Sequence, residues 1–150
     1  MQPNAGRRII VDADACPFKD TILEIASAHG LAVTLVANYC HDIEGGGAAE
    51  VVRVDKEPDA VDLAIANRAA PGDIVVTQDY GLAAMVLGKG CRALSPRGRI
   101  YTDGNIEGLL AERHLAQKAR RAGGRTKGPP RLSHADRECF RRALQSLAEQ

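Results

Sequence analysis

Residues 7–20, RRIIVDADACPFKD, place a short apolar run directly before two aspartates and a proline. Residues 8–11 form a mostly apolar run of strand length, which is typical of a strand buried on both faces of a parallel sheet. Asp12 and Asp14 follow where this run ends. Two carboxylates beside buried β-structure lose solvation and repel each other unless a cation or hydrogen-bond donors compensate them. The stretch therefore predicts a buried strand whose end places two aspartates at a ligand-binding edge of the sheet.

The rest of the chain alternates between strand and helix patterns. Strands are predicted over 31–38, 51–55, 74–77 and 91–94, and helices over 17–29, 59–70, 81–90, 105–122 and 133–148. The segments 39–50 and 122–131 are predicted loops, and 95–104 is a loop or an edge hairpin. This alternation predicts an α/β fold with a mostly parallel sheet covered by helices on both faces. We expect one domain over 1–150, with an α/β core over 1–104 and a helical basic extension over 105–150.

Particular residues mark the expected starts of three helices. Pro17 suits the first helical position, and Asn105 and Ser133 suit N-caps. Asp12 and Asp14 offer an alternative use of their carboxylates, because short polar residues commonly cap a helix such as the one expected from Pro17.

Composition and charge exclude several classes of protein. The 150 residues contain no Trp, 3 Tyr and 2 Phe, which argues against a wide aromatic platform for stacking bases. No apolar run is long enough to span a bilayer, and the four cysteines form no CxxC pair, so we expect a soluble, cytoplasmic protein with reduced thiols. Residues 1–110 carry 10 basic and 15 acidic side chains, whereas 111–150 carry 10 and 4. This asymmetry fits either an anionic partner or two solvated faces.

Acidic side chains follow more than one predicted strand. Asp79 stands two residues after the predicted strand 74–77, so it should share the edge where Asp12 and Asp14 lie. Asp59 and Asp62 are three residues apart near the start of a helix, which places them on one face of it. Such oxygen ligands suit Mg²⁺ or Mn²⁺, which keep open positions for water and phosphate. We expect Asp12, Asp14 and Asp79 to bind the metal.

Several motifs occur in the order that is found in one known family. They are VDADACPFKD (11–20), DAVDLAIA (59–66), PGDIVVTQDYGLAAMVLGKG (71–90), SPRGRIYT (95–102), NIEGLLAERH (105–114) and GPPRLSHADRECFRRAL (128–144). Over nearly its whole length the chain resembles the YaiI/YqxD family of uncharacterised bacterial proteins. That family is similar to PIN-like domains, which are metal-dependent ribonucleases with a three-layer sandwich fold.

The resemblance to PIN-like domains implies roles for individual acids. It places the first acid at Asp12, a helical acid at Asp59 or Asp62, and the strand-end acid at Asp79 within a TxD pattern. A further acid usually lies near the third one in PIN nucleases. Here Asp103 is only a loose candidate for it, and Asp14 is an additional acid.

The implied function is metal-dependent hydrolysis of phosphodiesters, with RNA or single-stranded nucleic acid as the expected partner. The catalytic residues would be Asp12, Asp14, Asp62 and Asp79, with water as the nucleophile. The basic side chains expected to bind phosphate are Lys19, Arg97, Arg120, Arg121, Arg125 and Lys127. A solvated, flexible linker is an equal alternative for Arg97 and the basic run, whereas a solvated first-turn lysine is the more ordinary interpretation of Lys19.

Two other functions remain open from the sequence. A PIN-like module with an incomplete site would bind RNA or a nucleotide without cleaving it. A haloacid-dehalogenase-like phosphatase also carries a DxDx[TV] motif after its first strand, but Cys16 stands at its last position here. Thr77 and Gln78 would either bind a ligand or only complete their strand.

Overall fold

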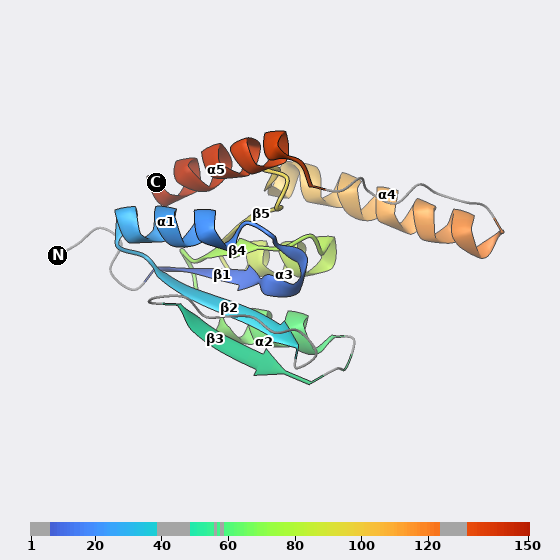
Figure 1. Ribbon diagram of the computed structural model, residues 1–150. Helices are drawn as coiled ribbons and strands as arrows, with labels where there is room; N and C mark the ends of the chain where they lie inside the picture. Colours follow the sequence, from blue (N-terminus) through green and yellow to red (C-terminus); the bar gives the residue numbers. More distant parts are fainter. Residues whose placement is uncertain (1–6, 39–48, 56, 58, 124–131) are drawn as a thin grey trace.

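The computed structural model describes residues 7–38, 49–55, 57, 59–123 and 132–150. Its elements alternate along the chain as the sequence predicts (Figure 1). In order they are β1 (Arg8–Asp12), the 3₁₀ turn η1 (Ala13–Ala15), α1 (Lys19–His29), β2 (Ala32–Asn38), β3 (Glu50–Val54), α2 (Ala60–Arg68), β4 (Ile74–Val76), α3 (Tyr80–Gly88), β5 (Arg92–Leu94), β6 (Ile100–Tyr101), α4 (Asp103–Arg121) and α5 (His134–Ala148).

The strands form one six-stranded sheet in the order β3-β2-β1-β4-β5-β6. The first five strands in this order are parallel, and β6 is antiparallel to β5. The prediction of a mostly parallel α/β sheet is therefore confirmed, and β6, within the segment 95–104, forms an edge hairpin with β5. From β1 the chain first builds outward to β3 and then returns to β4 on the other side of β1. The order therefore reverses between β1 and β4.

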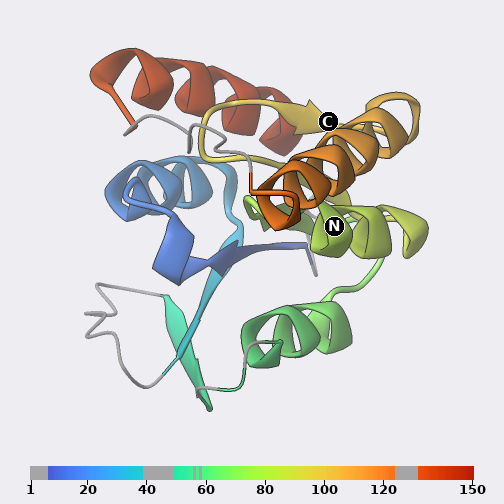
Figure 2. The ribbon, with the colours of Figure 1, turned by 90° about the vertical axis from the view of Figure 1, so that its right-hand side faces the viewer.

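Helices cover both faces of the sheet, which makes three layers (Figure 2). Ile9 and Val11 of β1 face one way and pack in a core with α1 and α5, including Ile22 and Phe140. Ile10 faces the other way and packs with apolar residues of α2, α3 and α4. The alternation of side chains along β1 explains how one short strand supplies both cores.

Two predicted helix starts are wrong. The helix expected from Pro17 begins at Lys19, because residues 13–15 first form η1 and Phe18 occupies the N-cap position. Asn105 is the third residue of α4 and not its cap. The cap is Thr102, whose Oγ1 accepts from the Asn105 N–H while Asn105 Oδ1 accepts from the Thr102 N–H. Ser133 caps α5 as predicted.

The segment after residue 104 divides into packed and projecting parts. Phe140 and Leu144 of α5 are fully buried, and Ile106 and Leu109 anchor the first half of α4. The second half of α4 extends beyond the body of the protein (Figure 1). Leu115 in this half is 65% exposed. The residues 39–48 and 124–131 of the two predicted loops lie outside the described part of the chain. None of the described helices is long and apolar enough to cross a membrane.

Candidate active site

The candidate site lies where β1 and β4 end side by side. Val11 of β1 pairs with Val76 of β4, so Asp12 and Thr77 are neighbours at the carboxyl edge of the sheet. The strand order reverses between these two strands. In open α/β sheets, such a reversal opens a crevice in which ligands bind.

Thr77 holds the two strand ends together. Its Oγ1 donates to Asp12 Oδ2 at 3.3 Å and accepts from the Asp79 backbone N–H at 3.0 Å. Its carbonyl oxygen accepts from Tyr101 Oη at 3.1 Å. Thr77 is fully buried, so its hydroxyl does more than complete a strand: it positions the carboxylate of one acid and the backbone of another.

Asp79 lies at the same edge of the sheet and also caps a helix. It is the N-cap of α3, and its Oδ1 accepts from the Leu82 N–H at 3.0 Å. The same oxygen lies 3.4 Å from Nη1 of Arg113, which comes from α4. The Asp79 carboxylate is therefore held in place by one backbone donor and one cation.

Asp62, in the first turn of α2, comes close to Asp79. The two carboxyl groups are close enough that the Asp79 side chain raises the pKa of Asp62. Asp59 occupies the N-cap position of α2 but its side chain makes no capping bond. Both helix starts line a cavity of about 400 Å³, here called the acid cavity. It is lined by Asp59, Asp62, Leu63, Asp79, Gly81, Leu82, Met85 and Arg113.

Burial and mutual repulsion change the acidity of this group. Burial, followed by the charges of Asp14 and Asp79, raises the pKa of Asp12 to about 6, although the Thr77 hydrogen bond opposes the shift. Burial and the neighbouring Asp79 also raise the pKa of Asp62 to about 6. Perturbed carboxyl groups in a cleft are typical of functional sites. At neutral pH the carboxylates of this group outnumber the one guanidinium group that the described residues place beside them, that of Arg113, and a bound cation would offset the excess of negative charge.

We expect Asp62→Asn to raise the melting temperature at pH 8. A carboxyl group whose pKa rises on folding holds its proton more tightly in the folded state, so the free energy of unfolding falls as pH rises from about 4 to about 6. The amide of this variant removes the cost at pH 8. Because solvent screens the half-exposed group, we expect only about 2–4 °C, near 1 kcal/mol for a domain of this size. Calorimetry at pH 4 and pH 8 measures the difference.

At pH 4 the Asp62→Asn variant and the wild type should melt at similar temperatures. Asp55→Asn is the matched control, because Asp55 is an exposed carboxylate just after β3. That control should melt like the wild type at both pH values. Equal destabilisation by Asp62→Asn at pH 4 and pH 8 would contradict the expectation.

Asp14 lies apart from the acid cavity. It is exposed in η1, and its Oδ2 accepts from the Asn38 N–H at 3.2 Å. Neither Asp12 nor Asp14 caps α1, whose N-cap residue Phe18 makes no side-chain capping bond. The capping alternative for these two aspartates is therefore wrong.

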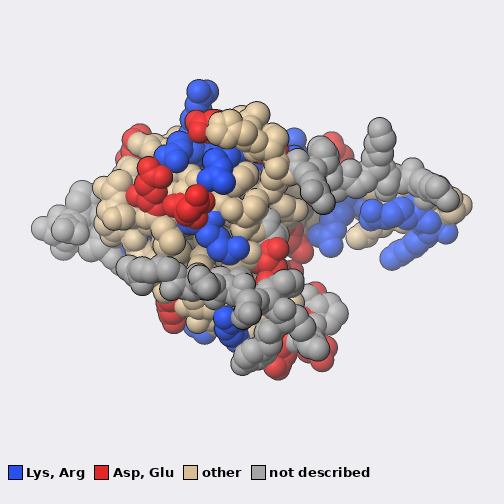
Figure 3. All heavy atoms as spheres, in the orientation of Figure 1, with Lys and Arg blue, Asp and Glu red and all other residues tan. Residues whose placement is uncertain are grey.

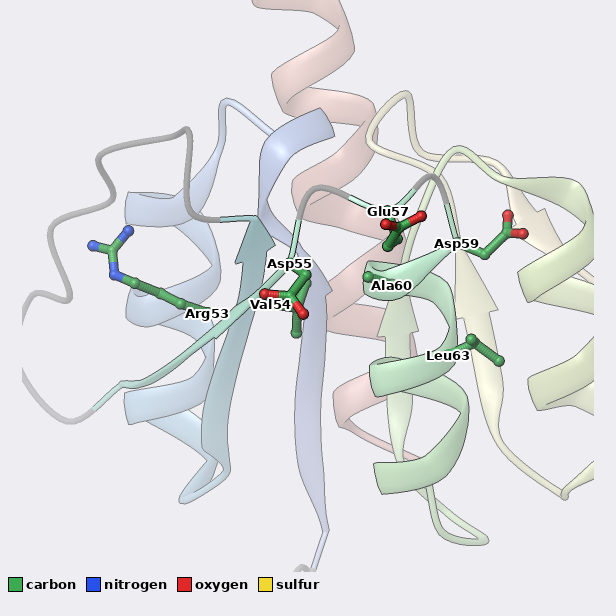
Figure 4. A pocket seen from close by; sticks show the side chains of 7 residues that line it. All are labelled: Arg53, Val54, Asp55, Glu57, Asp59, Ala60 and Leu63. Atoms are coloured by element: carbon green, nitrogen blue, oxygen red, sulfur yellow. The ribbon is translucent and has the colours of Figure 1, made fainter.

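A second acidic hollow of about 630 Å³ adjoins the acid cavity (Figure 4). It lies between the end of β3 and the start of α2, and it shares Asp59 and Leu63 with the acid cavity. Arg53 and Asp59 project in opposite directions in this view. Asp55 and Glu57 add carboxylates between them. The acidic surface therefore continues from α3 past α2 to β3.

The metal ligands remain a prediction. Within the described part of the chain, no three His, Cys, Asp or Glu side chains lie close enough together to hold a metal ion by themselves. Asp12 and Asp79 are nevertheless linked through Thr77. Mg²⁺ commonly takes only one or two carboxylates and keeps water or phosphate at its other positions. Asp12 and Asp79 would supply the carboxylate oxygens of such a site.

Two of the predicted phosphate-binding residues lie near the body of the domain. Lys19 is the half-buried first residue of α1. Arg97, in the turn between β5 and β6, forms an ion pair with Asp136 of α5 at 3.2 Å. Binding of phosphate by either residue is still a prediction.

The other predicted basic residues lie on or beyond the projecting half of α4. Arg120 and Arg121 are exposed in its last turn, whereas Arg125 and Lys127 lie outside the described residues. Lys and Arg side chains run along this projection, and Asp and Glu side chains gather at its base (Figure 3). The base of the projection is where Arg113 meets Asp79.

Arg113 is a residue of the site that no sequence motif indicated, and Asp103 is a candidate that lies elsewhere. Arg113 reaches the site because α4, about 28 Å long, starts at the opposite edge of the sheet and runs back past Asp79. Its spacing from the helix start carried no signal of this contact. Asp103 lines a hollow with Gly90 and Arg92 at the amino end of β5, so it is not an acid of the site.

Comparisons with known proteins agree on one family. The family model described as "Uncharacterized BCR, YaiI/YqxD family" matches residues 10–150. The UPF0178 protein of Ruminiclostridium cellulolyticum is 50% identical over 137 residues, covering 91% of this chain and 89% of the relative. A UPF0178 protein of Halalkalibacterium halodurans is 48% identical over 132 residues, covering 88% and 84%. No solved structure matches the chain.

Proposed function

This chain belongs to the YaiI/YqxD family, and we propose that it hydrolyses phosphodiester bonds in RNA with the help of Mg²⁺ or Mn²⁺. One observation carries the proposal: Asp12, Asp62 and Asp79 come from separate elements, yet their charges act on one another at one edge of the sheet. Carboxylates gathered without a cation cost free energy. A bound cation would offset this cost, which supports a role of these carboxylates in binding a cation and a phosphate.

Each residue of the proposed site would have a different role in the reaction. A bound divalent cation would polarise the scissile phosphate and lower the pKa of a bound water. Asp12 and Asp79, linked by Thr77, would hold that cation. Asp62, whose raised pKa suits proton transfer near neutral pH, would take a proton from the attacking water. Arg113 would move from Asp79 to the phosphate and offset its charge.

The proposal is tested with a fluorescently labelled single-stranded RNA. The purified wild type should cleave it in Mn²⁺, stop in chelator, and resume when Mn²⁺ is returned. Asp12→Asn should lose cleavage, whereas Asp103→Asn, at the opposite edge of the sheet, should retain it. Millimolar Mn²⁺ should also raise the melting temperature of the wild type, because a ligand that binds only the folded state stabilises it. Equal cleavage by both variants would indicate a contaminating nuclease and contradict the proposal.

A binding module without catalysis is the second candidate. The observation in its favour is that no set of three metal-ligating side chains is assembled among the described residues. Arg113 also pairs already with Asp79 and neutralises part of its charge. Metal-loaded protein that binds the RNA but never cleaves it would support this candidate over the nuclease.

A further inference from the structure

Another cavity opens on the other side of Asp79. Its volume is about 620 Å³, and we call it the arginine cavity. Gln78 and Tyr80 line it, and they are the chain neighbours of Asp79, which lines the acid cavity. The short segment after β4 therefore forms a wall between the two cavities. The remaining lining residues are Ser95, Arg97, Gly98, Arg99, Tyr101 and Cys139.

The turn that carries the two arginines is fixed in place. Ser95 Oγ accepts from the backbone N–H groups of Arg97 and Arg99, each at 3.2 Å, and the Ser95 N–H donates to the Arg99 carbonyl at 2.8 Å. Gly98 has a φ of +91°, and a Cβ there would lie 2.6 Å from the carbonyl carbon of Cys139. The turn is thus seated directly on α5. A ligand that binds here would not have to order the backbone.

The charge of the arginine cavity is opposite to that of the acid cavity. Its lining includes Arg97 and Arg99, and none of the described residues that line it carries a carboxylate. Asp136 of α5 pairs with Arg97 and fixes its orientation. Arg99 is exposed, and its guanidinium pairs with no carboxylate in the described part of the chain.

The chemistry of the arginine cavity suits a phosphate within a larger polar ligand. The planar guanidinium group binds phosphate oxygens through two parallel hydrogen bonds. Tyr80 and Gln78 add a ring and an amide beside it. The volume is in the range of pockets that accept a molecule of nucleotide size.

We infer that the arginine cavity binds the phosphate of a neighbouring nucleotide, so that the substrate is a polynucleotide strand that passes over Asp79 from one cavity to the other. This inference rests on the proposed function, which puts the scissile phosphate at the acid cavity. A small phosphate ester would occupy only one of the two cavities. The paired cavities therefore select a strand over a free nucleotide.

The test measures binding of a labelled phosphorothioate oligouridylate, a strand that resists hydrolysis, by fluorescence anisotropy in Mn²⁺, so that the acid cavity can hold its cation. Arg99→Ala should weaken binding about tenfold, the loss expected when one charge-assisted contact is removed. It should also reduce the slope of log affinity against log salt by about one. Arg92→Ala removes the same charge from an exposed position at the amino end of β5, and it should change neither quantity. Arg99→Lys should recover part of the affinity.

The same assay separates a strand from a free nucleotide. Uridine monophosphate should compete at least about tenfold more weakly than the oligouridylate, because it fills one cavity only. Equally tight binding of both ligands, with equal loss in Arg99→Ala, would overturn the inference. So would an Arg92→Ala variant that binds as weakly as Arg99→Ala, or a wild type that binds no RNA.

The exposed thiol of Cys139 reports on occupancy of the arginine cavity. Bound oligouridylate should slow its alkylation by iodoacetamide several-fold, as measured by mass spectrometry of the peptide that contains it. Arg99→Ala should lose this protection at the same RNA concentration. Unchanged alkylation under saturating RNA would overturn the inference.

These results separate the failure of the inference from the failure of the proposed function. If RNA binding depends on Arg99 and protects Cys139, but the protein never cleaves RNA, the inference about the arginine cavity holds and the proposed hydrolysis is wrong. If Asp12→Asn abolishes metal-dependent cleavage, but Arg99→Ala keeps the wild-type affinity and salt slope, the proposed hydrolysis holds and the inference about the arginine cavity is wrong.

Discussion

Asp79→Asn should lower kcat/KM for RNA cleavage by about 10²–10³-fold, the range seen when one pre-organised electrostatic contact in an active site is removed. The carboxylate of Asp79 lies near Asp62 and forms an ion pair with Arg113, and the Asp79 backbone N–H donates to the Thr77 hydroxyl that donates to Asp12. Removing its charge takes away one ligand of the proposed cation and the ion-pair partner of Arg113. The rate under single-turnover conditions in Mn²⁺ measures the loss.

The fold of this variant should survive, because asparagine is as good an N-cap as aspartate. The amide oxygen of the new side chain can still accept from the Leu82 N–H, as Asp79 Oδ1 does in the wild type. Removal of the repulsion on Asp62 should leave the melting temperature at pH 8 equal or higher. Asp103→Asn serves as the control of equal charge. A variant that keeps cleavage within a few-fold of wild type would remove Asp79 from the mechanism.

Phe140→Ala should lower the free energy of unfolding by about 3–5 kcal/mol. Phe140 is 0% exposed in α5, and its ring centroid lies 5.7 Å from that of Phe18 at the start of α1. Truncation leaves a cavity between α5 and the sheet, next to the buried Leu144. Urea unfolding followed by circular dichroism measures the change, because the transition midpoint moves with stability.

Leu115→Ala is the control for the Phe140 variant. Leu115 is 65% exposed on the projecting half of α4, so its truncation should change stability by no more than about 0.5 kcal/mol. A loss below about 1 kcal/mol in Phe140→Ala would mean that α5 is an appended helix. The expected large loss would make α5 part of the folding unit, although its surface is rich in charge.

Local sequence patterns were sufficient to predict most of the elements. Short apolar runs marked β1, β2 and β4, because a strand buried on both faces needs apolar side chains in both directions. The start of α1 was predicted too early, since Pro17 is compatible with a first turn and also with the extended chain that leads into it. The capping box of α4 is formed by Thr102 and Asn105. Both residue types are common at N-caps, so the local sequence did not show which of the two is the cap.

The sequence by itself determined that acid from β1 and β4 would meet, because parallel strands with right-handed crossovers bring their carboxyl ends to one edge. Only the tertiary structure decided which other groups join Asp12 and Asp79. Asp62 lies near Asp79 because α2 packs beside α3. Arg113 contacts Asp79 because α4 runs back across the sheet from its opposite edge. Arg99 faces its cavity because the turn after β5 is seated on α5. Such contacts depend on helix length and packing, whereas sequence periodicity carries information only about neighbours within a few turns.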